Sequence, residues 1–202
     1  MKLNRFFLIA CLAGPAMAED VTMVAPIFAQ IVAAPLPDGF APAFENTNGG
    51  SYLLEAVPQG ETLEAWTQMV TLSAAQGQGG VAGAAMGMAN GLAAGYRAAC
   101  PDLFVAEALP APPVPGASEV FAAFMGCPAI VNAPAEAMVV LVMGGAEDIY
   151  TLQWAARADA SQGPVAYDLA DWTPRLDRLA ARARLCPIVP GEAPPYPSCV
   201  GN

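Results

Sequence analysis

The apolar residues of this chain fall in short runs that predict strands separated by turns. A continuous apolar run from Met138 to Met143 is typical of a buried strand, and alternation of apolar and polar residues over 148–156 predicts a strand with one buried face. The turn-forming residues 46–50, Asn-Thr-Asn-Gly-Gly, predict a hairpin between the strands that flank them. The other predicted strands cover residues 39–45, 51–57, 102–108 and 119–125.

Residues 63–73 fit two periodicities. Apolar residues recur at helical spacing from Leu63 to Val70, whereas alternate residues from Trp66 to Leu72 would share one face of a strand. We expect a strand that begins at Trp66 and is entered through a short turn.

Two other segments have helical patterns. Residues 80–99 are rich in alanine and glycine and end at Cys100-Pro101. A second helix is expected to begin with Thr173 as its N-cap and Pro174 at its first position, and to end near Leu185. Residues 109–116 contain four prolines and are expected to form a loop.

Together these elements predict the α+β class, with a mainly antiparallel sheet of about six strands. One long Gly/Ala-rich helix and a C-terminal helix are expected to pack on that sheet. We expect residues 19–36 to form an extended and partly flexible N-terminal segment. Residues 37–202 then form a single domain, and no internal repeat indicates a second one.

The first eighteen residues have the pattern of a signal peptide. A basic start with Lys2 and Arg5 precedes a short apolar stretch, and Ala16-Met17-Ala18 is a small-x-small cleavage pattern. We expect cleavage after Ala18 and a periplasmic or secreted protein.

A second interpretation of the leader is a lipobox at residues 8–11, in which Cys11 would be lipidated. Only about five apolar residues precede this cysteine, fewer than the roughly 7–15 of an ordinary apolar region. Cleavage after Ala18 is therefore favoured.

Charge narrows the set of partners. The full chain has a net charge of −10. Without Lys2 and Arg5, six basic residues remain against eighteen acidic ones, which gives a net charge of −12. Such a balance argues against nucleic acids and anionic membrane surfaces as partners.

Four cysteines remain after the leader: Cys100, Cys127, Cys186 and Cys199. An even number in an exported chain indicates two disulfides, although four cysteines allow three connectivities. We favour Cys100–Cys127 and Cys186–Cys199, because each pair links the end of a predicted helix to a nearby loop or strand. The second bond would pin a C-terminal tail that contains five prolines.

The absence of two residue types limits the chemistry. The chain has no histidine, and none of its residues after the leader is a lysine. Histidine-dependent catalytic triads, the usual zinc sites and lysine Schiff bases are therefore excluded. Paired carboxylates at Glu147-Asp148 or at Asp168 and Asp171 remain as candidates, but a turn and a helix N-terminus are the usual explanation for such acids and are favoured here.

Glycines recur every four residues at Gly79, Gly83, Gly87, Gly91 and Gly95. Glycine inside a helix costs up to about 1 kcal/mol relative to alanine, so we expect a compensating close approach of another backbone. The favoured interpretation is that the last four pack tightly on the domain's own sheet, and that alanine there would destabilise the fold. The alternatives are that this glycine face contacts a second copy of the chain or a membrane, as in a glycine zipper.

Arginines are concentrated in the predicted last helix. Arg175, Arg178 and Arg182 share one face of it. On an acidic chain this face is a candidate site for an acidic partner, although a solvated helix face is the simpler explanation.

Two segments resemble a group of uncharacterised exported proteobacterial proteins: residues 61–71, ETLEAWTQMVT, and residues 147–157, EDIYTLQWAAR. The steps Cys100-Pro101 and Cys127-Pro128 and the C-terminal cysteine pair are also similar to that group. The arrangement of elements resembles PsbP-like domains, which implies a sheet flanked by helices with a binding or scaffolding role. Neither resemblance implies a catalytic residue.

These observations favour an exported, non-enzymatic module that binds a periplasmic protein or a small ligand. A glycine-zipper protein that associates with membranes or with itself, and a hydrolase that uses only carboxylates, are the alternatives. No catalytic residue, cofactor or metal ligand is assigned from the sequence.

Overall fold

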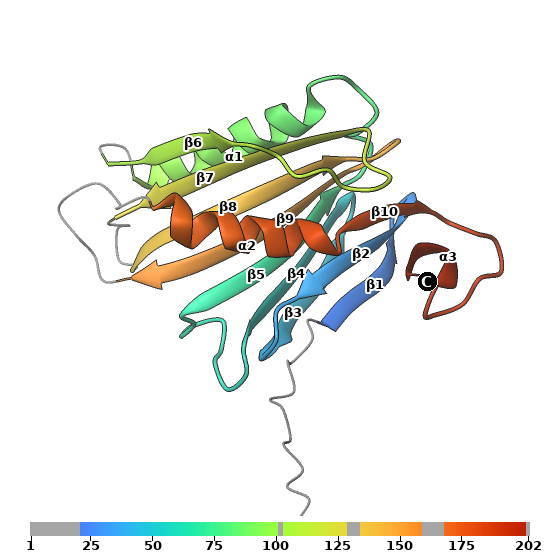
Figure 1. Ribbon diagram of the computed structural model, residues 1–202, viewed down its shortest axis with the longest axis horizontal. Coiled ribbons are helices and arrows are strands. Elements are labelled where there is room, and N and C mark those ends of the chain that lie inside the picture. The colour runs from blue at the N-terminus through green and yellow to red at the C-terminus, as the bar shows by residue number, and fades with distance from the viewer. Residues whose placement is uncertain (1–20, 101–102, 129–133, 159–167, 201–202) are drawn as a thin grey trace, which may run out of the picture.

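The computed structural model describes residues 21–100, 103–128, 134–158 and 168–200, which form two antiparallel sheets and three helices (Figure 1). The expectations for the leader, its cleavage after Ala18 and the lipidation of Cys11 lie outside the described residues.

The larger sheet has seven strands in the order β3-β4-β5-β9-β8-β7-β6, and neighbouring strands run antiparallel. The α+β class and the mainly antiparallel sheet predicted from the sequence are confirmed. So is the first hairpin, which turns at residues 49–50. The seven strands are β3 (Phe40–Asn48), β4 (Ser51–Pro58), β5 (Gln68–Ala75), β6 (Val105–Leu109), β7 (Glu119–Cys127), β8 (Ala135–Gly144) and β9 (Ile149–Ala158).

A smaller sheet corrects the expectation for the N-terminal segment. β1 (Val21–Ile27), β2 (Gln30–Leu36) and β10 (Arg184–Pro187) pair in the order β1-β2-β10. β2 is buried along its whole length, because Val32 and Ala34 face the main core while Ile31 and Ala33 face a small cluster around the C-terminal disulfide. This segment is therefore part of the domain rather than a flexible extension.

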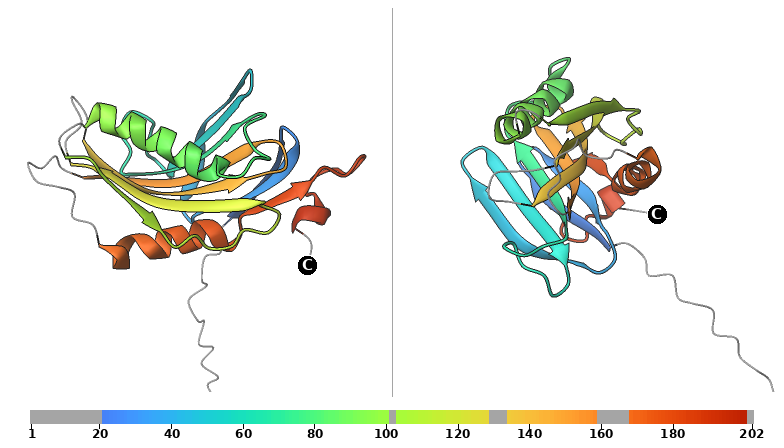
Figure 2. Two further views of the ribbon diagram at one scale, coloured as in Figure 1. Left: turned by 90° about the horizontal axis from the view of Figure 1, so that it is seen from above. Right: turned by 90° about the vertical axis from the view of Figure 1, so that its left-hand side faces the viewer.

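Two helices cover opposite faces of the large sheet (Figure 2). α1 (Ala84–Ala99) packs chiefly against β7 and β8, and α2 (Leu169–Ala181) packs against β8, β9 and β2. No helix of the described residues is long and apolar enough to cross a membrane.

The predicted bounds of the last helix are wrong at both ends. Its N-cap is Asp168, whose side chain accepts a hydrogen bond from the Ala170 N–H at 2.8 Å, and Pro174 lies inside the helix. The helix ends at Ala181 because the next residues turn into β10 and pair with β2.

The structure contains the two disulfides expected from the sequence. Cys100–Cys127 joins the end of α1 to the end of β7, with 5.9 Å between Cα atoms. Cys186–Cys199 joins β10 to the short helix α3 (Pro197–Val200), with 5.5 Å between Cα atoms.

The expected close packing of the glycine row on the sheet is wrong. Gly83 is the N-cap of α1 with φ +83°, not an interior residue. Among the described residues, no atom outside the adjoining helix backbone lies within 4 Å of a Cβ placed at Gly87, Gly91 or Gly95. The helix packs through its opposite side, where Ala85 and Ala89 are 2% exposed and lie with Met88, Leu92 and Tyr96.

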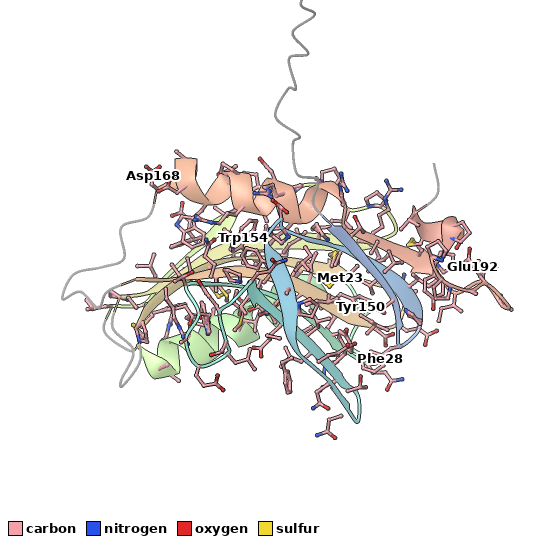
Figure 3. All side chains as sticks on the ribbon, turned by 90° about the horizontal axis from the view of Figure 1, so that it is seen from below. Met23, Phe28, Tyr150, Trp154, Asp168 and Glu192 are labelled. Carbon is pink, nitrogen blue, oxygen red and sulfur yellow. A yellow bond between two sulfur atoms is a disulfide. The ribbon has the colours of Figure 1, made fainter. Side chains whose placement is uncertain are left out.

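The alternation of β9 divides its side chains between the two faces of the sheet. Tyr150, Leu152 and Trp154 belong to the core under α2, where Figure 3 labels the first and last of them. Ala155 belongs to the cluster under α1, and Arg157 lies two residues further along the same strand. The polar and charged residues of the α1 face are the ones that form the site described next.

Candidate functional site

A pocket of about 430 Å³ opens on the α1 face of the large sheet, beside the helix. Strands β4, β5, β8 and β9, the end of α1 and the loop before β5 all contribute to its wall. Its apolar lining residues are Leu53, Leu63, Trp66, Met69, Met138 and Ala155. Its polar lining residues are Glu55, Thr71, Tyr96, Glu136, Gln153 and Arg157.

Strand register explains why these side chains meet. Glu55 pairs with Thr71 and Thr71 with Gln153, so these three form one row across β4, β5 and β9. Arg157 pairs with Glu136 of β8. Residues two apart on a strand point to the same face, so Gln153 and Arg157 both face the pocket.

Arg157 has two partners among the described residues. Its Cζ lies 3.7 Å from the centre of the Trp66 ring, a close cation–π contact. Its Nε lies 4.0 Å from Glu136 Oε2, an ion pair beyond hydrogen-bond distance. Nε is buried and has no hydrogen-bond partner among the described residues, so stacking on Trp66 rather than a hydrogen bond fixes this atom.

Tyr96 fixes the position of the Glu136 carboxylate. Its hydroxyl donates a short hydrogen bond to Glu136 Oε1. Burial, and then the charge of Glu136, raise the pKa of Tyr96 far above its ordinary value, so the phenol stays protonated at neutral pH. Glu136 is thereby shared between a tyrosine donor and the arginine.

The loop that carries Trp66 is fixed by hydrogen bonds at its base. Glu61 accepts hydrogen bonds from the Thr67 N–H at 2.6 Å and from the Thr67 hydroxyl at 2.7 Å. The backbone N–H of Arg157 donates a hydrogen bond to the backbone carbonyl of Thr67 at 2.9 Å, which joins the loop to β9. Trp66 is 7% exposed and packs on the α1 face, whereas Val70 and Leu72 face α2. The expectation that these three share one face is wrong, because β5 begins only at Gln68.

Glu55 also lines the pocket, two strands and four residues away from Arg157. Burial raises the pKa of this carboxyl above its ordinary value, and no hydrogen bond or ion pair to a described residue offsets that effect. Beside it, Ser73 and Gln153 both hydrogen-bond to the Thr151 hydroxyl, at 2.7 and 3.1 Å. Thr71 and Gln153 line this half of the pocket, and Glu55 has no charge partner among the described residues.

The arginines singled out from the sequence lie away from the pocket, on or just after α2. Arg175 and Arg178 place their guanidinium groups over aromatic rings, with Cζ 5.9 Å and 5.4 Å from the centre of the Trp154 ring. Arg182 lines a smaller hollow of about 200 Å³ together with Arg184. The three do not meet in one site.

Two of the candidate carboxylates, Asp148 and Asp168, accept hydrogen bonds that hold the backbone in place. Asp148 is 1% exposed and accepts hydrogen bonds from the Ala29 and Gly77 N–H groups, at 2.9 and 2.8 Å, and from the Tyr150 hydroxyl at 3.3 Å. It joins the β1–β2 turn to the large sheet. Asp168 caps α2, as Figure 3 shows. Among the residues that the structure describes, no three histidine, cysteine or acidic side chains gather as metal ligands.

Four residues of the pocket were not predicted as site residues from the sequence: Trp66, Tyr96, Glu136 and Arg157. One signal was available, because Glu136 and Arg157 are charged residues that lie just outside the predicted strands 138–143 and 148–156. The contact between them depends on the register of β8 and β9, which the sequence does not give.

No family model and no curated protein matches this chain. Several solved structures align with it, and two of them are Mog1 structures. One is a mutant of Protein Mog1, at 11% identity and a TM-score of 0.47, over 81% of this chain and 90% of that one. The other is the Saccharomyces cerevisiae Ran-binding protein Mog1p, at 12% identity and a TM-score of 0.43, over 69% of this chain and 79% of that one. At these values the alignments carry no argument about function.

Proposed function

We propose that this protein is an exported, non-enzymatic binding module whose pocket beside α1 holds a small amphipathic ligand. The observation that supports this most is the environment of Arg157. Its guanidinium lies on Trp66 in the wall of a pocket, with a buried Nε that has no hydrogen-bond partner. Apolar walls with a few fixed polar groups are typical of small-molecule sites.

The placement of the acids favours binding over hydrolysis. Glu55 and Glu136 both line the pocket, but they lie three strands and several residues apart. Ordinary strand spacing and rise put their Cα atoms about 19 Å from each other, and side chains that stand roughly perpendicular to the sheet keep their carboxyl groups at a similar separation. In carboxylate pairs that cleave glycosidic bonds the carboxyl groups are only about 5–9.5 Å apart. Glu136 is also engaged by Tyr96.

Export is supported by the leader pattern and by the two disulfides, which form and persist outside the reducing cytoplasm. The intact mass of the protein recovered from the periplasm or medium tests this part of the proposal. We expect a chain that begins at Glu19. A mass that includes an acylated Cys11 would instead identify a lipoprotein.

Ligand binding is tested by thermal unfolding with three probes: octanoate, octylamine and the tripeptide alanyl-leucyl-alanine. A ligand that binds only the folded state raises the melting temperature by mass action. We expect at least one probe to raise it in the unmodified protein, Trp66→Ala to remove the effect and Arg157→Gln to reduce it. Arg184→Gln, a change at an exposed arginine of β10, is the matched control and should keep it. If no probe shifts the melting temperature, the proposed function is wrong.

A further inference from the structure

The two ends of the pocket differ in charge. At one end, Trp66 covers a face of the Arg157 guanidinium. Glu136 approaches its Nε no closer than 4.0 Å, and this buried Nε has no hydrogen-bond partner among the described residues. A carboxylate is the group that a guanidinium binds best, through two parallel N–H···O hydrogen bonds. The arginine end of the pocket therefore suits a carboxylate ligand.

The other end suits a cation. Glu55 is half-buried in the pocket wall, and within the described part of the chain neither a hydrogen bond nor an ion pair stabilises its charged form. Burying an acid without a partner is unfavourable, and an ammonium group would supply that partner. Thr71 and Gln153, in the same row as Glu55, add a hydroxyl and an amide that can bind polar groups of a ligand.

The spacing of the two ends sets the length of the ligand. Gln153 lies two strands from Glu55 and four residues from Arg157 along β9. Ordinary strand spacing and rise then separate the Cα atoms of Glu55 and Arg157 by about 16 Å, and side chains that stand roughly perpendicular to a sheet keep their charged groups a similar distance apart. An extended tripeptide spans roughly 10 Å, and a hydrogen bond of about 2.9 Å at each end brings this to about 16 Å. Between the ends, Met69 and Met138 provide an apolar wall for a central side chain.

From these positions we infer that the ligand is a short peptide with free ends, about three residues long, whose carboxylate binds Arg157 and whose ammonium binds Glu55. This inference rests on the proposed function of the pocket and specifies its ligand class. The peptide's opposite end charges match the two oppositely charged ends of the site. A fatty acid or an alkylamine would satisfy only one of them.

The test is isothermal titration of the exported chain, with both disulfides intact, using four forms of alanyl-leucyl-alanine. The forms are the free peptide, its C-terminal amide, its N-acetyl derivative and the peptide capped at both ends. A hydrogen-bonded charge pair contributes enough that each cap should weaken binding about tenfold or more. The double cap should weaken it further.

Variants assign each effect to a residue. In Arg157→Gln the free peptide and the amide should bind alike, and in Glu55→Gln the free peptide and the N-acetyl form should bind alike. Arg184→Gln and Glu147→Gln change exposed residues outside the pocket and should keep the full cap dependence. Melting curves show whether each variant is folded. If Arg157→Gln does not fold, the four peptides on the unmodified protein still decide the question.

Three results would overturn the inference. If the N-acetyl peptide or octanoate binds as tightly as the free peptide, the ammonium site is wrong while the proposed pocket stands. If the amide or octylamine binds as tightly, the carboxylate site is wrong. If neither the peptides nor octanoate nor octylamine binds, the proposed function itself is wrong.

Discussion

Arg157 and Trp66 are in direct contact, with the guanidinium carbon 3.7 Å from the centre of the indole ring. The arginine comes from β9 and the tryptophan from the loop before β5, so this pair closes one end of the pocket. The same loop is joined to β9 through the Thr67 carbonyl. The shape of the pocket therefore depends on how a loop is held against the sheet.

The first prediction concerns Trp66. It is 7% exposed, and replacing a buried tryptophan with alanine costs about 3–5 kcal/mol. Trp66→Ala should lower the free energy of unfolding in this range and abolish ligand binding. Trp66→Phe keeps an aromatic face for Arg157, so it should lose less stability and less ligand affinity than Trp66→Ala. Urea unfolding and peptide titration of the two variants check this, and equal behaviour of the pair would contradict it.

A pH dependence follows from Glu55. Burial raises its pKa in the folded state above the ordinary value of 4.5, so the unfolded chain releases this proton first as the pH rises. Below pH 4.5 Glu55 is protonated in both states, and its burial does not reduce the free energy of unfolding. As the pH rises through the folded-state pKa, the buried carboxyl must ionise and the protein loses stability. Glutamine stays neutral at every pH.

Glu55→Gln should therefore be more stable than the unmodified protein at about pH 7, and the difference should vanish at about pH 3.5. Melting temperatures of both proteins across this range measure it. Glu147→Gln, at an exposed turn, should show no such trend. A Glu55→Gln protein that is less stable at neutral pH would show that Glu55 has a stabilising charge partner.

Local patterns predicted the strands well, because the alternation of β9 and the apolar run of β8 are properties of consecutive residues. The site depends on contacts between distant segments. The sequence does not show that the Trp66 loop folds back on Arg157, or that α1 places Tyr96 beside Glu136. The buried β2 was also missed, because its cover comes from β10 and the C-terminal disulfide at the far end of the chain.

The glycine row shows a further limit. Alanines and glycines both recur every four residues in α1, and spacing alone does not decide which set faces the sheet. Ala85 and Ala89 do so, and Gly87 and Gly91 lie on the exposed side. The apolar stripe of Met88, Leu92 and Tyr96 next to the alanines was the signal that separates the two faces.

The exposed glycines give a prediction of opposite sign to the one made from the sequence. Gly87→Ala and Gly91→Ala introduce a methyl group into open space, so each should gain up to about 1 kcal/mol from helix propensity. For a chain of this size that is a rise of about 2–4 °C in the melting temperature.

Gly79→Ala is the matched control from the same row. Its Cβ would lie 2.1 Å from the Asp148 carbonyl oxygen, so this variant should lower the melting temperature. If Gly87→Ala and Gly91→Ala also lower it, the glycine face of α1 is covered in solution.

The two disulfides should differ in their effect on binding. Each disulfide stabilises the fold by about 3 kcal/mol in the chain-entropy account, because it restricts the unfolded chain. Cys100 follows Tyr96 by four residues at the end of α1, so the double variant Cys100→Ser/Cys127→Ser should lose stability and also weaken peptide binding. Cys186→Ser/Cys199→Ser should lose stability but keep the affinity of its folded fraction. Equal affinity in both variants would contradict this role for the first disulfide.

The most direct test of the pocket is a map of ¹⁵N–¹H chemical shifts during titration with alanyl-leucyl-alanine. The protein has three tryptophans, and only Trp66 lines the pocket, whereas Trp154 and Trp172 pack in the core on the α2 face. We predict that the indole signal of Trp66 and the Nε–H signal of Arg157 shift together with saturation, while the other two indole signals stay in place. Shifts confined to Trp154 and Trp172, or saturation of binding with no change at Trp66 and Arg157, would contradict the pocket beside α1 as the ligand site.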